Sequence, residues 1–444
     1  MNKFKKVILS IMVSGLIIAT PVFATVDSAL LDTATQVART SAFMPVSSHR
    51  MAMGGAGLGL GGFYDSYLYN PANLSKDGFK IVLPSLTLTV NNVYNLMMPE
   101  DGSDDIITIL EEGGDNAPVK LGTLLLKSIP FGYGEIMSLN TNVGLKTRSF
   151  GLDLAVQQKL RSYNGGGDYT TASAISETNI AATAALGFNI PLIKDILSID
   201  VGASGAFNYK AYSMALDANE AINLISLINS GSSAETAVME SIPFASGYAI
   251  PVTAGVNINL PLGLTISGVG RNFNGNYNMV GFTNLKSLIN NDETLVALIG
   301  EDTLDTTNTT VPTDDDKFVV EVPWTVDVGL AFAPSTPLDG LIKAQFAFDF
   351  IDCYGIIEDL INETRTPIQL QSDALASLNA GVQLRLLSLV DVRAGLSQGY
   401  KSVGVGLDLL VLHLDASYYW REYGDVLGQS PSDALSLKFS FLSK

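Results

Sequence analysis

Hydrophobic and polar residues alternate along the last seventy residues of the chain with almost no interruption. One run has apolar residues at every second position: Leu378, Ala380, Val382, Leu384 and Leu386. A period of two places one set of side chains on each face of a β-sheet. The pattern therefore predicts strands with one apolar face. That face points inward in a soluble sandwich and outward, toward lipid, in a membrane barrel.

Thirteen runs of strand character can be counted, and the region 130–147 has room for a fourteenth. The runs cover residues 79–94, 150–162, 180–190, 197–212, 248–260, 264–279, 318–332, 341–351, 374–387, 390–396, 402–411, 412–421 and 433–442. Single-chain bacterial barrels have an even number of strands, and closure removes the unpaired edges of a long sheet. We therefore predict an all-β fold, a transmembrane antiparallel β-barrel of about fourteen strands. A large soluble sandwich is the alternative.

Charged residues recur on the polar face of these runs. Counted in phase, the set comprises Asp327, Lys343, Asp349, Arg385, Asp391, Arg393, Asp408, Asp415, Arg421 and Lys438. Mixed charges are costly against lipid, whereas inside a barrel they can pair and form hydrogen bonds. The charge pattern therefore favours a barrel with a polar lumen.

The N-terminus has the three parts of an export signal. Lys3, Lys5 and Lys6 precede a largely apolar stretch over residues 7–18, and Ala24 supplies a small residue for cleavage. We predict a signal peptide over residues 1–24. Its removal takes away three lysines and no acids, which leaves 23 Lys+Arg against 44 Asp+Glu and a net charge near −21. A chain this acidic repels nucleic acid.

No apolar run of 18 residues follows the signal, so no transmembrane helix is expected. Export and alternating strands together predict the bacterial outer membrane. The residues needed for catalysis are scarce, because the chain has two histidines, His49 and His413, and one cysteine, Cys353. We expect no enzyme activity, no cofactor and no metal site. For His413 and the nearby Asp415, a structural polar network is favoured over a catalytic site.

A glycine-rich segment precedes the first strand. Residues 51–62 read MAMGGAGLGLGG, and YNPANL follows at residues 69–74. Residues 57–62 match G-x-G-x-x-G formally, but no strand precedes them and no βαβ unit follows, so a dinucleotide site is rejected. This segment resembles the N-terminal region of the long-chain fatty-acid transporter FadL and its PorV-like, TraF-like and treponemal relatives. Residues 392–400, VRAGLSQGY, resemble the penultimate hairpins of the same group.

The resemblance implies a fourteen-stranded barrel, over residues 79–444, with a small N-terminal hatch over residues 25–78. The residues expected to form the hatch are Gly54, Gly55, Gly57, Asn70, Pro71 and Ala72. It also implies uptake of a hydrophobic molecule by passive diffusion, with movement of the hatch admitting the ligand. PorV-like relatives serve protein secretion instead, and a secretion or surface-attachment scaffold is the second hypothesis.

Segments with helical spacing interrupt the strands and are expected in long extracellular loops. They lie near residues 104–129, 217–240, 284–300 and 356–361. Two of these helices have apolar faces, formed by Leu224, Ile225, Ile228, Leu285, Leu288 and Ile289. The two faces either pack on each other as a lid or form a groove that captures an apolar ligand.

Lys210 and Arg271 are candidate cations for the carboxylate of a fatty acid. The partners expected are a hydrophobic small molecule such as a long-chain fatty acid, outer-membrane lipid and the barrel-assembly machinery.

Overall fold

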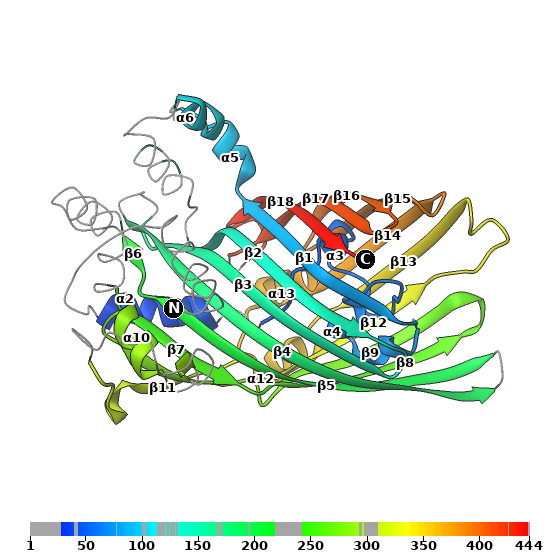
Figure 1. Cartoon of the computed structure of the whole chain (residues 1–444), viewed down its shortest axis with the longest axis horizontal. Coiled ribbons are helices and arrows are strands. Elements are labelled where there is room, and N and C mark those ends of the chain that lie inside the picture. Colours follow the sequence, from blue (N-terminus) through cyan, green and yellow to red (C-terminus); the bar gives the residue numbers. More distant parts are fainter. Residues whose placement is uncertain are drawn as a thin grey trace.

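A computed structural model places the chain as a barrel with an N-terminal segment inside it (Figure 1). It describes residues 28–39, 43–76, 78–99, 104–112, 120, 124, 129, 132–166, 171–193, 196–217, 242–292, 295–296, 310–424 and 426–442. The predicted signal peptide and the predicted helical segment over 217–240 lie outside these residues, apart from Asp217. None of the helices in the described part of the chain is long and apolar enough to cross a membrane.

The described residues form eighteen strands in one antiparallel sheet. They are β1 (Lys80–Asn91), β2 (Gly132–Lys146), β3 (Phe150–Asn164), β4 (Ala172–Ile193), β5 (Leu197–Ser213), β6 (Leu216–Asp217), β7 (Phe244–Ala249), β8 (Val252–Leu260), β9 (Leu264–Phe273), β10 (Tyr277–Phe282), β11 (Lys317–Val320), β12 (Thr325–Phe332), β13 (Ile342–Phe350), β14 (Leu378–Leu386), β15 (Val390–Ser397), β16 (Tyr400–Leu409), β17 (Leu412–Glu422) and β18 (Pro431–Phe441). β1 pairs with β2 on one side and with β18 on the other, which closes the sheet.

Four positions in the ring are shared by two consecutive strands, so the barrel has fourteen positions. β7 and β8 share one position, because both pair with β5. β9 and β10 share the next, because β9 pairs with β8 and β10 pairs with β7. β11 and β12 continue the same arrangement, and β6 extends β5 along β4. The predicted number of strands is confirmed, and β2 occupies the region where a fourteenth strand was expected.

The polarity of the wall is the reverse of that in a soluble protein. On β15, Val392 is 45% exposed on the outer face, while Asp391 and Arg393 on the inner face are buried. The outer face elsewhere carries exposed leucine, valine and phenylalanine, as on β12 and β13. A surface of this kind is stable only in an apolar solvent, so the wall spans a membrane. The soluble sandwich is excluded.

The two ends of the barrel differ in their connections. Short turns join β2 to β3, β8 to β9 and β16 to β17, whereas long segments join β1 to β2, β5 to β7 and β13 to β14. In bacterial barrels long loops face the outside and short turns face the periplasm. The end with the long segments is therefore called the outer end. The wall is taller on one side, because β4 has 22 residues and β15 has 8.

The α-helices lie inside the barrel or in the long segments that join its strands (Figure 1). Inside are α2 (Ser28–Arg39), α3 (Ser48–Ala52), α4 (Ser66–Tyr69) and the 3-10 helix η1 (Pro71–Lys76). The loops contain α5 (Val93–Met97), α6 (Ile106–Glu112), α10 (Leu285–Asn291), α12 (Cys353–Asn362) and α13 (Pro367–Ala376). Two short 3-10 turns, η3 (Pro261–Gly263) and η4 (Asp314–Asp316), complete the set. Three of the four predicted helical regions have a helix in the described residues.

Candidate functional site

The segment over residues 43–76, called the hatch segment below, crosses the lumen. Its Gly54 lies against the backbone of Leu396 on β15, and its Pro71 lies against Gly202 on β5. These two strands are six positions apart in a ring of fourteen, so they belong to nearly opposite walls. The hatch segment therefore spans the barrel from wall to wall.

A row of wall glycines lets one end of the hatch segment approach the strand backbone. Gly187, Gly202 and Gly255 are paired neighbours on β4, β5 and β8. A Cβ on Gly202 would overlap the carbonyl carbon of Pro71, and a Cβ on Gly187 would lie 2.9 Å from the Leu74 Cβ. Only glycine leaves room for such an approach. The second docking point is similar, because Gly381 and Gly395 pair beneath the backbone of Met53.

The glycine-rich stretch of the hatch segment turns on left-handed backbone conformations. Gly54, Gly55 and Gly57 have φ of 65°, 76° and 130°, which side chains rarely tolerate. The turn presents the N–H groups of Gly57 and Leu58 to one carboxylate oxygen of Asp349 on β13, at 2.7 and 3.0 Å. A carboxylate that accepts two backbone donors binds strongly.

Two asparagines of the N-P-A-N sequence, at residues 70–73, fix the end of the hatch segment that docks on β5 and β8. The Asn70 amide donates to the Leu58 carbonyl at 3.0 Å and to the Asn257 side chain at 2.8 Å. The Asn73 amide donates to the same Leu58 carbonyl at 3.0 Å, and the Asn257 amide donates to Asn73 Oδ1 at 2.9 Å. Pro71 starts η1, where its missing N–H costs nothing. The amides therefore join the glycine turn, η1 and the wall strand β8.

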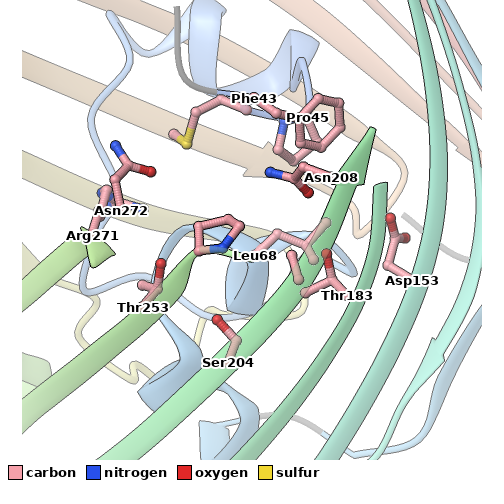
Figure 2. A pocket seen from close by; sticks show the side chains of 13 residues that line it. Phe43, Pro45, Leu68, Asp153, Thr183, Ser204, Asn208, Thr253, Arg271 and Asn272 are labelled. Atoms are coloured by element: carbon pink, nitrogen blue, oxygen red, sulfur yellow. The ribbon is translucent and has the colours of Figure 1, made fainter. Parts of the chain in front are cut away.

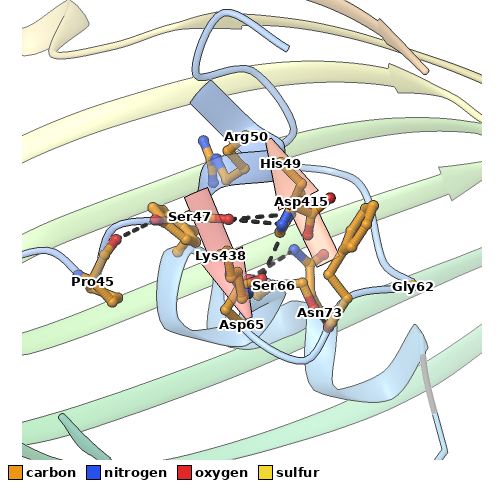
Figure 3. Close-up of polar contacts among 12 residues, drawn as sticks. Pro45, Ser47, His49, Arg50, Gly62, Asp65, Ser66, Asn73, Asp415 and Lys438 are labelled. Atoms are coloured by element: carbon orange, nitrogen blue, oxygen red, sulfur yellow. Dashed lines mark hydrogen bonds and ion pairs between the residues drawn. The ribbon is translucent and has the colours of Figure 1, made fainter. Parts of the chain in front are cut away.

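A buried polar cluster lies at the centre of the hatch segment (Figure 3). The Ser47 hydroxyl is hydrogen-bonded to His49 Nδ1 at 2.8 Å, and the His49 ring stacks on Phe63 with centroids 3.7 Å apart. Asp65 lies 3.6 Å from His49 Nε2 and 3.7 Å from the Lys438 ammonium of β18. All of these polar side chains are buried.

Burial determines the protonation of the two titratable groups of the cluster. Burial lowers the pKa of His49 to about 3, with the positive charges of Lys438 and Arg393 in the same direction and Asp65 opposing. Burial alone would raise the pKa of Asp65, but the surrounding groups, Lys438 and Ser47 among them, bring it to about 2. At neutral pH the cluster therefore holds a neutral imidazole beside an ionised carboxylate.

A cavity of about 50 Å³ lies between the hatch segment and the wall (Figure 2). Its lining combines apolar and polar groups from the hatch segment and from the inner face of β3–β9: Phe43, Met44, Pro45, Leu68, Asp153, Thr183, Ser204, Ala206, Asn208, Pro251, Thr253, Arg271 and Asn272. The volume is enough for a few water molecules, whereas sites for small organic ligands have about 300–1,000 Å³. The cavity as it stands is therefore too small for such a ligand.

Arg271, one of the two candidate cations, lines this cavity and is paired with Asp327 on β12. Lys210, the other candidate, is fully buried nearer the outer end. Its ammonium contacts Glu177 at 3.1 Å, and Arg161 bonds the same carboxylate. The two cations lie on the luminal face, and both have acidic partners.

The apolar residues predicted to bind a ligand are only partly described. Leu224, Ile225 and Ile228 lie outside the described residues, so the predicted groove between the two helices stays a prediction. Leu285 and Leu288 of α10 are fully buried. They pack with Tyr209, Met214, Leu216, Ile242, Phe244, Phe282 and Leu295, and Ile289 packs against this cluster. In the described residues, α10 therefore covers the outer face of the tall wall.

The N-terminal helix α2 occupies the outer end of the lumen, which the sequence pattern did not indicate. Ala34 and Val37 are buried against the inner faces of β4, β5, β7, β10 and β11. The Thr35 hydroxyl and the Tyr212 hydroxyl are hydrogen-bonded at 2.9 Å. The interior is therefore filled at two levels, by α2 at the outer end and by the glycine turn with η1 below it.

The inverted wall and the filled lumen define the class of this protein. It is a transmembrane β-barrel of fourteen strands with an internal plug.

No family model matches the chain, and no curated protein matches its sequence. Among solved structures, the chain is similar to the Pseudomonas putida toluene transporter TodX, with a TM-score of 0.42, 10% identity, and 90% of this chain and 98% of that one covered. It is also similar to the CymD monoaromatic hydrocarbon channel (TM-score 0.40, 11% identity, 89% and 97% covered). A third similar structure is a Pseudomonas aeruginosa FadL homologue (0.42, 9% identity, 90% and 99% covered). At these TM-scores the likeness assigns neither a ligand nor a function.

Proposed function

We propose that this protein is an outer-membrane channel for the uptake of hydrophobic small molecules, long-chain fatty acids among them. The ligand diffuses passively, and displacement of the hatch segment opens its way. One observation carries the proposal: the hatch segment fills the lumen between nearly opposite walls, at Leu396 and Gly202. A barrel closed in this way differs from a polar porin, whose lumen is a water-filled channel.

The cavity beside the hatch segment supports a site for an amphiphilic ligand. Phe43, Met44 and Leu68 offer apolar surface on the hatch side. Arg271 offers a guanidinium whose partner, Asp327, an incoming carboxylate would replace. Because the cavity is small, a fatty acid fits only after Phe43–Leu68 shifts, so ligand entry and hatch movement are coupled in this proposal.

A reversible cross-link between the hatch segment and the wall tests this coupling. A Cβ on Gly255 would lie 3.1 Å from Asn70 Cγ, the position that the sulfur of a cysteine at 70 would occupy, so the two side chains are close enough for a disulfide. We suggest Asn70→Cys/Gly255→Cys in a Cys353→Ser background, reconstituted in liposomes with a fluorescent long-chain fatty acid outside. Oxidation is expected to stop uptake, and reduction should restore it.

The single variant Asn70→Cys, in the same background, is the matched control, because it cannot form the cross-link and leaves Gly255 unchanged. Equal uptake by the oxidised and the reduced double variant would eliminate the hatch as the gate. Uptake and binding no greater than those of an unrelated barrel, in every redox state, would instead eliminate the transport proposal.

A secretion or attachment scaffold is the second candidate, and one observation favours it. α5 and α6 project from the outer end of β1, away from the barrel (Figure 1). This arm exposes Tyr94, Met97, Met98 and Ile107. Exposed apolar groups of this kind mark protein interaction sites. Retention of an exported protein by the full-length barrel, and its loss in Tyr94→Ser/Met98→Ser, would support the scaffold.

A further inference from the structure

The loop helix α12 has an apolar and a polar side, and much of its apolar side is exposed among the described residues. At 100° per residue, apolar residues fall on one side: Cys353, Tyr354, Ile356, Ile357, Leu360 and Ile361. Glu358, Asp359 and Asn362 fall on the other side. Leu360 is 61% exposed and Ile361 is 72% exposed. Helices of globular proteins bury such a side, so this one requires an apolar neighbour.

The position of α12 along the barrel coincides with the upper limit of the lipid-facing wall. β12 presents apolar side chains outward from Val326 to Phe332. Its eight residues extend about 26 Å along the strand, which is about 18–21 Å in height at a tilt of 35–45°, and the apolar band of such barrels is about 25 Å tall. The band therefore reaches the level just beyond the outer end of β12. Trp324 immediately precedes β12 at the outer limit, where aromatic residues form a girdle. α12 starts three residues after β13 ends, at the same level.

An aromatic stack on the outer face joins the apolar side of α12 to the wall. Phe273 of β9 stacks on Trp324 with centroids 5.8 Å apart, and Trp324 contacts Tyr354 of α12 at 4.1 Å. The exposed residues Ile357 and Ile361 follow Tyr354 on the same side of the helix. The apolar surface of the wall thus continues without a break onto α12.

Local contacts fix how the helix is set against the wall. The Cys353 thiol donates to the Val326 carbonyl, and the Asp352 N–H donates to Asp327 Oδ1 at 2.9 Å. The Asp352 side chain caps the helix by accepting the Gly355 N–H at 3.1 Å. The first turn is therefore attached to β12, and the rest of the helix extends from this attachment.

We propose that α12 is an interfacial helix that lies in the outer leaflet of the membrane. Tyr354, Ile357, Leu360 and Ile361 contact acyl chains, while Asp359 and Asn362 face water. The continuity of the apolar surface with the lipid-facing wall identifies lipid, rather than a protein, as the occupant. This inference depends on the membrane-spanning class of the barrel and not on transport.

The test is a measurement of depth in the bilayer at two positions on opposite sides of the helix. Ile361→Cys and the matched control Asn362→Cys, each in the Cys353→Ser background, are labelled with an environment-sensitive fluorophore in phosphatidylcholine vesicles. The label at 361 is expected to show blue-shifted emission and strong quenching by brominated acyl chains, with neither effect at 362. Serine at 353 keeps a donor for the Val326 carbonyl.

Three results would overturn the proposal. Red-shifted emission at both positions would place α12 in water. Blue-shifted emission at 361 without quenching by brominated lipid would mean that protein, such as a second copy of the chain, covers the helix. Quenching of equal strength at 361 and 362 would remove the division into a lipid side and a water side. Heat-modifiable migration of both labelled proteins on gels verifies that each barrel is folded.

Discussion

The carboxylate of Asp349 accepts the backbone N–H of Gly57 at 2.7 Å, and this bond joins the inner face of β13 to the glycine turn of the hatch segment. The same oxygen accepts the Leu58 N–H. Arg50 lies 3.7 Å from it and adds a positive charge. One wall residue thereby holds the segment whose displacement we propose as the opening step.

Removal of this carboxylate should loosen the glycine turn. A hydrogen bond to a charged group contributes about 1.5–3 kcal/mol, so in Asp349→Ala we expect amide exchange at Gly57 and Leu58 to accelerate roughly 10- to 100-fold. Asp349→Asn is the matched control, because its amide oxygen still accepts an N–H. Exchange that is equally slow in both variants would show that the wall glycines alone hold the turn.

Gly202 should be intolerant of even one added carbon. A Cβ there would overlap Pro71, and overpacking costs about 1–3 kcal/mol. We expect Gly202→Ala to displace η1 and raise ion conductance through single barrels in planar bilayers. Gly205→Ala on the same strand is the control, because nothing lies within 4 Å of its added Cβ. Identical conductance in the two variants would contradict the close docking of η1.

Acid should destabilise the hatch cluster through His49. Burial holds the pKa of His49 at about 3, below the ordinary 6.5, so the displaced cluster binds the proton more readily than the docked one. The stabilisation that neutral His49 gives to the docked hatch segment is complete above pH 6.5 and is lost as the pH falls toward 3. The equilibrium constant for docking falls at most about tenfold per pH unit. Asp65, with a pKa of about 2, loses its contribution in the same direction below pH 4.

The measurement is limited proteolysis or amide exchange of residues 43–76 between pH 7 and pH 4. His49→Gln, which keeps hydrogen-bonding capacity without titrating, should flatten the profile. A wild-type profile that is already flat would show that His49 stays neutral in both the docked and the displaced state.

Leu288 should stabilise the outer loop without supporting the barrel itself. It is fully buried against the outer face of the tall wall, and Leu→Ala at such sites costs about 2–5 kcal/mol. In Leu288→Ala we expect protease cleavage within residues 283–292, while heat-modifiable migration of the barrel is unchanged. Ile289→Ala, at a partly buried position, should be cleaved more slowly. Equal resistance of both variants would contradict the packing described for α10.

The strands were predictable because a period of two is a local property of the sequence. The runs over 248–260 and 264–279 were each predicted as one strand, and the structure divides them at Pro251, which has no N–H to donate, and at 274–276. α13 was mistaken in part for the start of a strand at 374. Thr366, Pro367 and Gln369 supply a capping box with proline at the first position, a signal that identifies this helix.

The docking of the hatch segment was not predictable in the same way. The glycines 187, 202 and 255 are distant in sequence, and they form a row only because the register of two ladders aligns them. α2 was not predicted, although Leu31, Ala34, Val37 and Ala38 recur at helical spacing and signal an amphipathic helix. The cavity could not be predicted either, because it lies between the docked hatch segment and the wall. Local periodicity determines the strands, whereas the contents of the lumen depend on register and closure.

The route of the N-terminal segment restricts the order of assembly. The chain passes from α2 at the outer end, through the hatch segment, to the start of β1 at the periplasmic end, and β1 then pairs with β18 at the far end of the sequence. A barrel that closed first would have to be threaded along its whole length. Closure of the β1–β18 seam around a segment already in place avoids that threading. The pairing of the first and last strands is therefore the step that determines whether a folded barrel contains its plug.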